Sequence, residues 1–167
     1  MNILEQKDKL LILDADMFVF SSAWEFREQM NILGSLAARK KLDTILEGIL
    51  ERIEPDYYIG FFGKTGSKNF RYSLAQSRPY KEARDKRKVE WIDYFRPILK
   101  QHMSDKWNFH CTEHIEADDA VSICFNQLKD KYNIILSFED KDLKQIAYFC
   151  DQDVQAFNPK TKKYFKI

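Results

Sequence analysis

The chain lacks three features that would assign it to a specialised class of protein. Its longest apolar stretches, Leu10–Leu13 and Asn133–Leu136, have the length of strands rather than the ~20 residues of a membrane span. It shows no signal-peptide pattern, internal repeat or low-complexity tract. Its three cysteines, Cys111, Cys124 and Cys150, are odd in number and without CxxC spacing, which argues against a disulfide framework. We therefore expect a cytoplasmic protein that does not bind membranes.

The residues that are present fit one folded unit. At 167 residues, 44% hydrophobic and 32% charged, the chain is long enough to bury a core, and we expect a single domain over residues 1–167. Short apolar runs alternate with segments of helical periodicity, which predicts an α/β fold with a mostly parallel twisted sheet covered by helices on both faces. Pro97 is expected to kink or restart one of these helices. Strands are expected at 9–13, 56–62, 108–111 and 133–137, helices at 24–30, 42–53, 89–103, 117–129 and 142–149, and a terminal hairpin from 154–157 and 163–167.

Positive charge is concentrated in one segment, although the net charge of the chain is only +1. Residues 64–88 carry nine lysines and arginines against two acids, so this segment is +7 and the remainder is −6. A solvated surface explains many charge runs, but the aromatic residues interleaved here, Phe70, Tyr72 and Tyr80, offer stacking surfaces for bases. The segment therefore favours nucleic acid as a partner. Its candidate nucleic-acid-binding residues are Lys64, Lys68, Arg71, Arg78, Tyr80, Lys86, Arg87 and Lys88.

Carboxylates gather where predicted strands give way to helices or loops. In an open α/β sheet, ligands collect outside the carboxyl ends of the strands, so acids from distant segments are expected to converge there. Crowded carboxylates repel one another unless a divalent cation neutralises them, and the pattern therefore indicates Mg²⁺ or Mn²⁺. Each cluster alone would also fit acids that cap helices or solvate loops. The clusters are Asp14 and Asp16, then Glu116, Asp118 and Asp119, then Asp140 and Asp142.

Two other motifs match known sites less well. Gly63-Lys64-Thr65 is similar to the end of a phosphate-binding P-loop, but Tyr58 stands where such a loop needs a glycine. The segment His110–His114 contains two histidines and a cysteine, but no second Cys or His pair at zinc-finger spacing accompanies it. We therefore interpret the histidines and the cysteine as residues at the end of a strand.

Short motifs occur in an order that points to a known family. Tyr80-Lys81-Glu82-Ala83-Arg84 lies in the basic segment, Glu116-Ala117-Asp118-Asp119 opens a helix, and Asp140-Lys141-Asp142-Leu143 follows a strand. Together with Leu11-Ile12-Leu13-Asp14 and the pair Phe70-Arg71, they resemble the 5′-nuclease family of flap endonucleases and 5′→3′ exonucleases. That family includes phage enzymes and the nuclease domain of bacterial DNA polymerase I. The resemblance covers nearly the whole chain.

The resemblance implies a three-layer α/β/α, PIN-like fold that cuts phosphodiester bonds in DNA with 5′ ends or flaps. It implies up to two Mg²⁺ or Mn²⁺ ions, which activate a water and stabilise the attacking and leaving oxygens. Lys81 and Arg84 would be the catalytic cations that neutralise the scissile phosphate. The implied metal ligands, direct or through water, are Asp14, Glu116, Asp118, Asp140 and Asp142, with Asp119 in the first or an outer position and Asp16 as a further candidate.

Two departures from the family pattern leave an alternative open. The family's second strand normally ends in a metal-binding aspartate, whereas Gly63 stands there, so Asp16 or Glu139 would have to compensate. Family members also continue into a helix-three-turn-helix module that grips duplex DNA, which is not among these residues, so a partner chain is a candidate source of duplex binding. The alternative is a weakened or inactive nuclease fold that binds nucleic acid or a partner protein. An RNA substrate also remains open.

Overall fold

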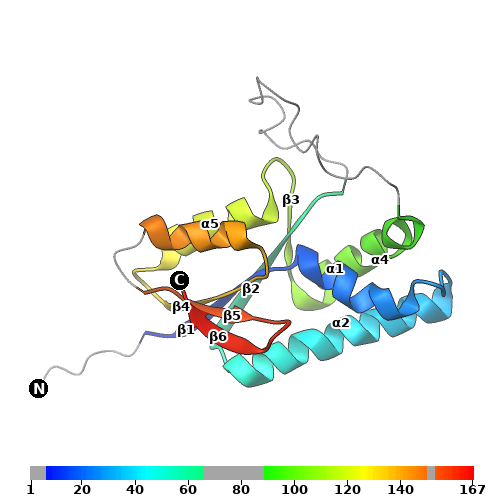
Figure 1. Ribbon diagram of the computed structural model, residues 1–167, viewed down its shortest axis with the longest axis horizontal. Helices are drawn as coiled ribbons and strands as arrows, with labels where there is room; N and C mark the ends of the chain where they lie inside the picture. Colours follow the sequence, from blue (N-terminus) through cyan, green and yellow to red (C-terminus); the bar gives the residue numbers. More distant parts are fainter. Residues whose placement is uncertain (1–6, 66–88, 150–152) are drawn as a thin grey trace, which may run out of the picture.

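Figure 1 shows the computed structural model, which describes residues 7–65, 89–149 and 153–167. Within these ranges six strands form one sheet in the order β3-β2-β1-β4-β5-β6, parallel except for β6, which runs antiparallel to β5. This confirms the predicted α/β fold with a mostly parallel sheet and a terminal hairpin. The strands are β1 Lys9–Asp14, β2 Tyr57–Gly63, β3 His110–Thr112, β4 Asn133–Ser137, β5 Gln155–Asn158 and β6 Lys163–Lys166.

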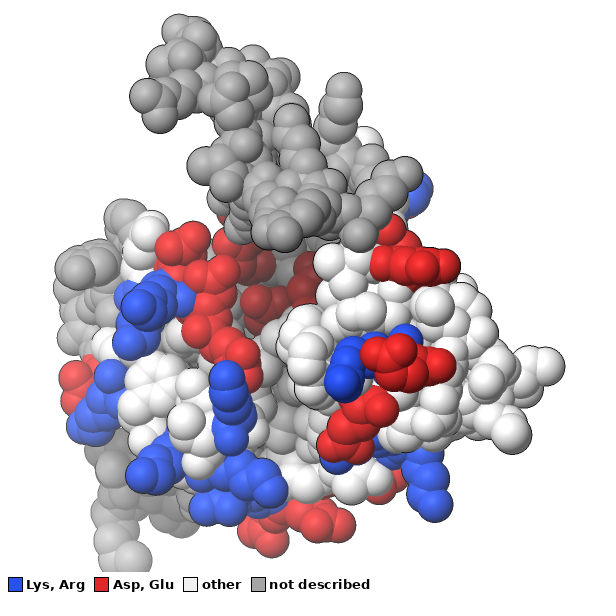
Figure 2. Space-filling model, turned by 45° about the vertical axis from the view of Figure 1, so that its right-hand side comes forward, with Lys and Arg blue, Asp and Glu red and all other residues white. Residues whose placement is uncertain are grey.

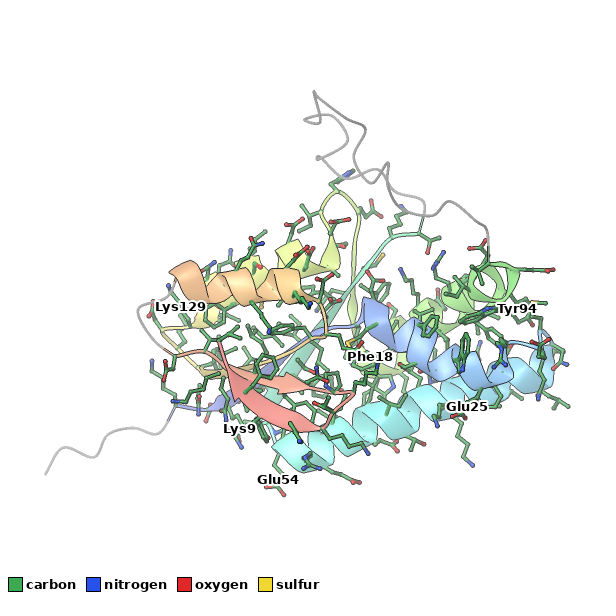
Figure 3. All side chains as sticks on the ribbon, viewed as in Figure 1. Lys9, Phe18, Glu25, Glu54, Tyr94 and Lys129 are labelled. Carbon is green, nitrogen blue, oxygen red and sulfur yellow. The ribbon has the colours of Figure 1, made fainter. Side chains whose placement is uncertain are left out.

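Helices cover both faces of the sheet, as the alternating pattern predicts (Figure 1). α1, α2 and α4 pack on one face, and α5 and η2 pack on the other. Phe18, labelled in Figure 3, lies between α1 and the sheet and is fully buried. None of the described helices is long and apolar enough to cross a membrane. The helices are α1 Asp16–Ala23, α2 Ile32–Ile53, α4 Glu90–Trp107 and α5 Ala117–Leu128, with 3₁₀ helices η1 Trp24–Phe26 and η2 Lys141–Phe149.

The central strand β1 explains why the sheet was predictable. A strand that is buried on both faces reads as a continuous apolar run, and alternate side chains enter opposite cores. Leu11 and Leu13 pack with α2 and α4, whereas Leu10 and Ile12 pack with α5. The run ends at Asp14, the last residue of β1, which places a carboxylate at the carboxyl end of this strand.

Two helix starts differ from the sequence pattern. The prediction of a helix at 24–30 is wrong, because the chain is helical over Asp16–Ala23 and only the 3₁₀ turn η1 follows. α2 starts at Ile32 rather than at residue 42. The side chain of Asn31 accepts a hydrogen bond from the N–H of Gly34 at 2.9 Å and caps this helix. Because Ile32 and Leu33 in its first turn are exposed, no amphipathic pattern marks that turn.

Two further details correct the predicted elements. Pro97 does not restart the helix, since α4 runs continuously over Glu90–Trp107 with Pro97 inside it. Phe95 and Leu99, on either side of this proline, are both fully buried, so packing holds the helix together across it. The helix predicted at 142–149 is of the 3₁₀ type.

Asp43 ties α2 to α4 at the far end of this helical layer. Its Oδ1 atom accepts hydrogen bonds from Trp107 Nε1 and His102 Nε2, both at 2.8 Å, and its Oδ2 atom lies 2.9 Å from Lys106 Nζ. Burial alone would raise the pKa of Asp43, but the hydrogen bonds from Lys106, Trp107 and His102 outweigh it and hold the pKa below its ordinary value. The charged carboxylate therefore stabilises the packing of the two helices.

Asp43→Ala is expected to lower the free energy of unfolding at pH 7 by about 1–3 kcal/mol, because the indole N–H of Trp107 loses its acceptor. The pKa of Asp43 is lower in the folded state, so its contribution is complete above the unfolded value of 3.8 and is lost as the pH falls below it. Urea unfolding at pH 7 and at pH 3 measures both effects. Glu47→Gln is the matched control, because Glu47 lies 4.0 Å from Lys106 and is mostly exposed. An equal loss in the control would contradict the assignment.

Candidate active site

Acids from three segments lie where the parallel strands end. β1 ends at Asp14, Asp118 lies in the first turn of α5, and Asp140 follows β4, whose last residue is Ser137. The carboxyl ends of parallel strands meet at one edge of a sheet, which brings these segments together. Figure 2 shows acidic side chains gathered around a recess in the surface. The sheet topology therefore produces the convergence that the motif order predicts.

Asp14 lies at the centre of this group. Its side chain is partly buried, and its pKa is raised from 3.8 to about 7. Burial is the largest cause, followed by the neighbouring charges of Asp16, Asp118 and Asp140, while a hydrogen bond from the backbone of Asp16 acts in the opposite direction. Four carboxylates are thus close enough to repel one another. A positive charge placed among them would relieve that repulsion.

Asp16 contacts the end of β2, although its side chain is still 44% exposed. It is the first residue of α1, so it reaches the site from a helix and not from a strand. Its Oδ2 atom accepts a hydrogen bond from the N–H of Gly63 at 3.0 Å, and its Oδ1 atom lies 2.8 Å from Lys100 Nζ. A Cβ atom at Gly63 would lie 3.2 Å from Oδ2. The carboxylate of Asp16 therefore borders the space that an aspartate at position 63 would enter.

The three acids at the start of α5 combine a capping role with their place at the site. The carboxylate of Asp119 accepts the backbone N–H of Glu116 at 3.1 Å, and Oδ1 of Asp118 accepts the N–H of Asp119 at 2.9 Å. Negative charge here also interacts favourably with the helix dipole. The interpretation that these acids cap a helix is thus correct, and it is compatible with a second role, because the charge of Asp118 also acts on Asp14.

The loop after β4 supplies the remaining acids. Oδ1 of Asp140 accepts the backbone N–H of Asp142 at 3.0 Å, which fixes the turn into η2, and both side chains are exposed. Of these two carboxylates, Asp140 is the one whose charge raises the pKa of Asp14. Glu139, the other candidate to replace the missing acid, is exposed and borders a groove beside Met17 and Phe20 of α1. Asp16, and not Glu139, is the acid that contacts Gly63.

Of the candidate nucleic-acid-binding residues in the basic segment, Lys64 is the one that the structure describes. Lys64 Nζ lies 2.9 Å from Glu113 Oε1 in an exposed ion pair, and the pKa of Lys64 is raised by its hydrogen bond to Glu113. This contact joins the end of β2 to the loop after β3. The other predicted cationic and aromatic residues lie outside the described ranges, namely Lys68, Arg71, Arg78, Tyr80, Lys81, Arg84, Lys86, Arg87 and Lys88.

The chemistry of the converging side chains fits Mg²⁺ or Mn²⁺. Both ions prefer oxygen ligands, and the group around Asp14 offers carboxylate oxygens whose charges act on one partly buried acid. Across residues 7–65, 89–149 and 153–167, no three His, Cys, Asp or Glu side chains are already arranged as a ligand cluster, and this includes the segment His110–His114. Among the described residues, the carboxylates that could hold an ion are those of the Asp14 group.

The sequence and the fold both match known nucleases. Residues 9–166 match the family model described as the 5′-3′ exonuclease N-terminal, resolvase-like domain. The chain belongs to this family. No curated protein sequence matches it significantly. The family membership agrees with the motif order, since the matched residues include every acid cluster and the basic segment.

Solved structures from bacteriophage T5 share the fold of this 5′-3′ exonuclease domain. A T5 protein co-crystallised with metal ions is 17% identical with a TM-score of 0.68, and the alignment covers 94% of this chain and 56% of that one. The T5 5′-exonuclease with zinc bound is 17% identical with a TM-score of 0.66, over 94% and 57% of the two chains. A T5 flap endonuclease variant in a pseudo-enzyme–product complex with DNA and metal ions is 14% identical with a TM-score of 0.59, over 94% and 57%. The chain thus spans a little over half the length of these structures.

Sequence reasoning misses one charged residue of the exonuclease domain's candidate site. Lys100 of α4 points to the end of β2 and contacts both Asp16 and the carbonyl oxygen of Gly63. It belongs to none of the motifs. The only signal in the sequence is a lysine directly after Leu99 in an amphipathic helix, and such a lysine is usually solvated.

Proposed function

We propose that this chain is the metal-dependent nuclease domain of a 5′-nuclease that cleaves DNA at 5′ ends or flaps. The observation that carries the proposal is the convergence of Asp14 with Asp118 and Asp140 at the sheet edge of a 5′-3′ exonuclease family domain. Like charges crowded around the partly buried Asp14 are unfavourable without a compensating positive charge, which supports binding of a cation. The proposal takes residues 1–167 as a single domain.

The proposed metal ligands divide by their position. Asp14, Asp118 and Asp140 form the central set, and Glu116, Asp119 and Asp142 lie beside them and act directly or through water. Bound Mg²⁺ or Mn²⁺ supplies Lewis acidity to the phosphate and a water of lowered pKa. The protein's own part is to hold these carboxylates together. β1 and α5 fix Asp14 and Asp118, which limits the reorganisation needed during the reaction.

The proposed partner of the site is nucleic acid. Lys81 and Arg84 are assigned to the scissile phosphate on the strength of the motif they occupy, and the remaining cations of residues 64–88 are assigned to the phosphate backbone. The T5 flap endonuclease variant was crystallised with DNA and metal ions, which supports this class of ligand. A partner chain is the proposed source of any further grip on duplex DNA.

Cleavage of defined substrates tests the proposal. Purified protein is incubated with 5′-flap, nicked and single-stranded DNA and with RNA, each labelled at one end, with Mg²⁺, with Mn²⁺ and with a chelator. Metal-dependent cleavage that is fastest on the 5′-flap substrate supports the proposed function. Cleavage of RNA alone reassigns the substrate. Binding of these nucleic acids without cleavage under every condition overturns the proposed nuclease activity.

Lys81→Ala is expected to lower kcat/KM by about 10²-fold, the loss typical when one cationic or hydrogen-bonding group that stabilises transition-state charge is removed. The reason is the loss of positive charge at the phosphate, so the effect should fall on kcat more than on KM. Single-turnover cleavage at saturating protein measures the chemical step. Lys129→Ala removes a lysine beyond the other end of α5 and should leave the rate unchanged. Equal losses in both variants would contradict the role of Lys81.

One observation favours the second candidate, a weakened nuclease fold that binds nucleic acid without efficient cleavage. Gly63 supplies no carboxylate, and Asp16, which borders that space, is paired with Lys100. The site then has one acid fewer for metal binding. Tight, salt-dependent binding of flap DNA by a protein without cleavage activity would support this candidate.

A further inference from the structure

A lysine occupies the corner of the candidate site at the end of β2. Lys100 reaches there from α4, and its ammonium lies 2.8 Å from Oδ1 of Asp16 and donates to the carbonyl oxygen of Gly63. Its side chain is only 13% exposed, and Nζ lies 5.7 Å from the centre of the Phe62 ring. A lysine buried to this degree needs compensating contacts for its charge. These contacts fix a positive charge at this corner.

The same contacts engage both oxygens of Asp16. Oδ1 faces the ammonium of Lys100, and Oδ2 accepts the N–H of Gly63 at 3.0 Å. The space beside Gly63 is limited by this carboxylate, because a Cβ atom there would lie 3.2 Å from Oδ2. The absence of a side chain at Gly63, the inward turn of Asp16 and the burial of Lys100 therefore form one arrangement.

We propose that Lys100 is the resident cation of this corner and competes with a divalent ion for Asp16. Its ammonium pairs with Asp16 and holds it against the end of β2, where a second metal ion would otherwise be attracted. The inference rests on the proposed function, because it concerns the same carboxylate site. Lys100 is a positioning residue, since it acts through Asp16. The chain then binds one ion tightly, through the set of Asp14, Asp118 and Asp140.

Mn²⁺ binding to the whole chain, measured by calorimetry and by loss of the free-ion electron paramagnetic resonance signal, tests this inference. Lys100→Met keeps most of the side-chain volume but removes the charge, and it should bind a second Mn²⁺ or tighten binding about tenfold, because a cation in contact with the ligand is gone. Lys100→Arg keeps the charge and should bind Mn²⁺ like the wild type. Unchanged or weaker binding by Lys100→Met overturns the inference.

Lys106→Met is the matched control. It removes the same charge from the same helix, six residues further along, where the lysine pairs with Asp43 instead of the site acids. Its Mn²⁺ affinity should stay within about twofold of the wild type, because exposed charges at this distance are largely screened by salt. An equal gain in Lys100→Met and Lys106→Met would show a general charge effect and overturn the inference.

A second variant keeps the inference testable if Lys100→Met does not fold, which a thermal melt decides. In Asp16→Asn the metal affinity should change by less than about threefold, because Asp16 is paired with Lys100 and is not a ligand of the ion in this inference. Asp118→Asn, in contrast, should lose tight binding. A loss in Asp16→Asn as large as that in Asp118→Asn would show that Asp16 is an ordinary ligand and would overturn the inference.

The two proposals fail differently. Tight Mn²⁺ binding that Asp118→Asn removes and Lys100→Met does not alter overturns the role of Lys100 alone. Intact Mn²⁺ binding without cleavage of any substrate overturns the proposed nuclease activity alone. No binding by the wild type and by Lys100→Met alike overturns both, since no competition then exists.

Discussion

Asp118→Asn is expected to lower kcat/KM for metal-dependent cleavage on the order of 10³-fold, because several kcal/mol of charge stabilisation are removed. Asparagine has nearly the shape of aspartate and keeps an oxygen that can accept the N–H of Asp119, which Oδ1 of Asp118 accepts at 2.9 Å. The start of α5 should therefore remain folded. The variant removes the negative charge that acts on Asp14 and, in our proposal, on the bound ion.

Cleavage of a 5′-flap substrate and Mn²⁺ binding are measured together for this variant. Asp130→Asn is the matched control, because it makes the same change at an exposed position beyond the other end of α5. Its activity should stay within about twofold of the wild type, since its charge is remote from the site and screened. Full activity in Asp118→Asn would exclude the central set of carboxylates as the metal site.

The fold was predictable wherever the pattern of side chains has a single physical explanation. The apolar run before Asp14 fits a strand that is buried on both faces, and β1 is that strand. α5 was equally clear, since acids in the first turn precede an amphipathic face, and its predicted start at Ala117 is confirmed. Burial agrees with the local sequence preference in β1, and burial and the helix dipole both agree with it in α5.

The start of α2 was hidden because its first turn is not amphipathic. Ile32 and Leu33 are 78% and 74% exposed, so their apolar character reports nothing about a core. The informative residue is Asn31, whose side chain caps the helix, but asparagine is common in loops and turns as well. A helix whose beginning is specified by one cap is difficult to place from sequence.

The candidate site was predictable as a group of acids but not as a set of contacts. Family motifs name Asp14, Asp118 and Asp140, and strand order brings them together. The pairing of Asp16 with Lys100 joins residues far apart in the chain and depends on which way α1 and α4 turn at the sheet edge. Periodicity carries no information about such a pair. Only the three-dimensional arrangement shows that Gly63 leaves room for it.

Asp14→Asn is expected to stabilise the metal-free protein at pH 8 by roughly 2–4 kcal/mol while removing its cleavage activity, because a buried charge among like charges is lost. The pKa of Asp14 is about 7 in the folded protein against 3.8 as the ordinary value, so the folded state holds the proton more tightly. Stability is therefore lost as the pH rises from 3.8 to 7, and the cost is complete above pH 7. Thermal melts should show a gain of roughly 5–15 °C at pH 8 and little difference at pH 3.

Asp140→Asn shows whether the gain in stability depends on burial of the carboxylate or only on removal of a charge. It removes a charge from the same sheet edge, but Asp140 is exposed, so its gain in metal-free stability should be clearly smaller. Addition of Mg²⁺ provides the second comparison, since an ion that binds only the folded state stabilises it in proportion to its affinity. The wild type should gain stability with Mg²⁺, and Asp14→Asn should gain little. A wild type that is more stable than Asp14→Asn without metal would mean that contacts within the protein stabilise the Asp14 carboxylate. The charge of Asp14 would then not indicate a cation site.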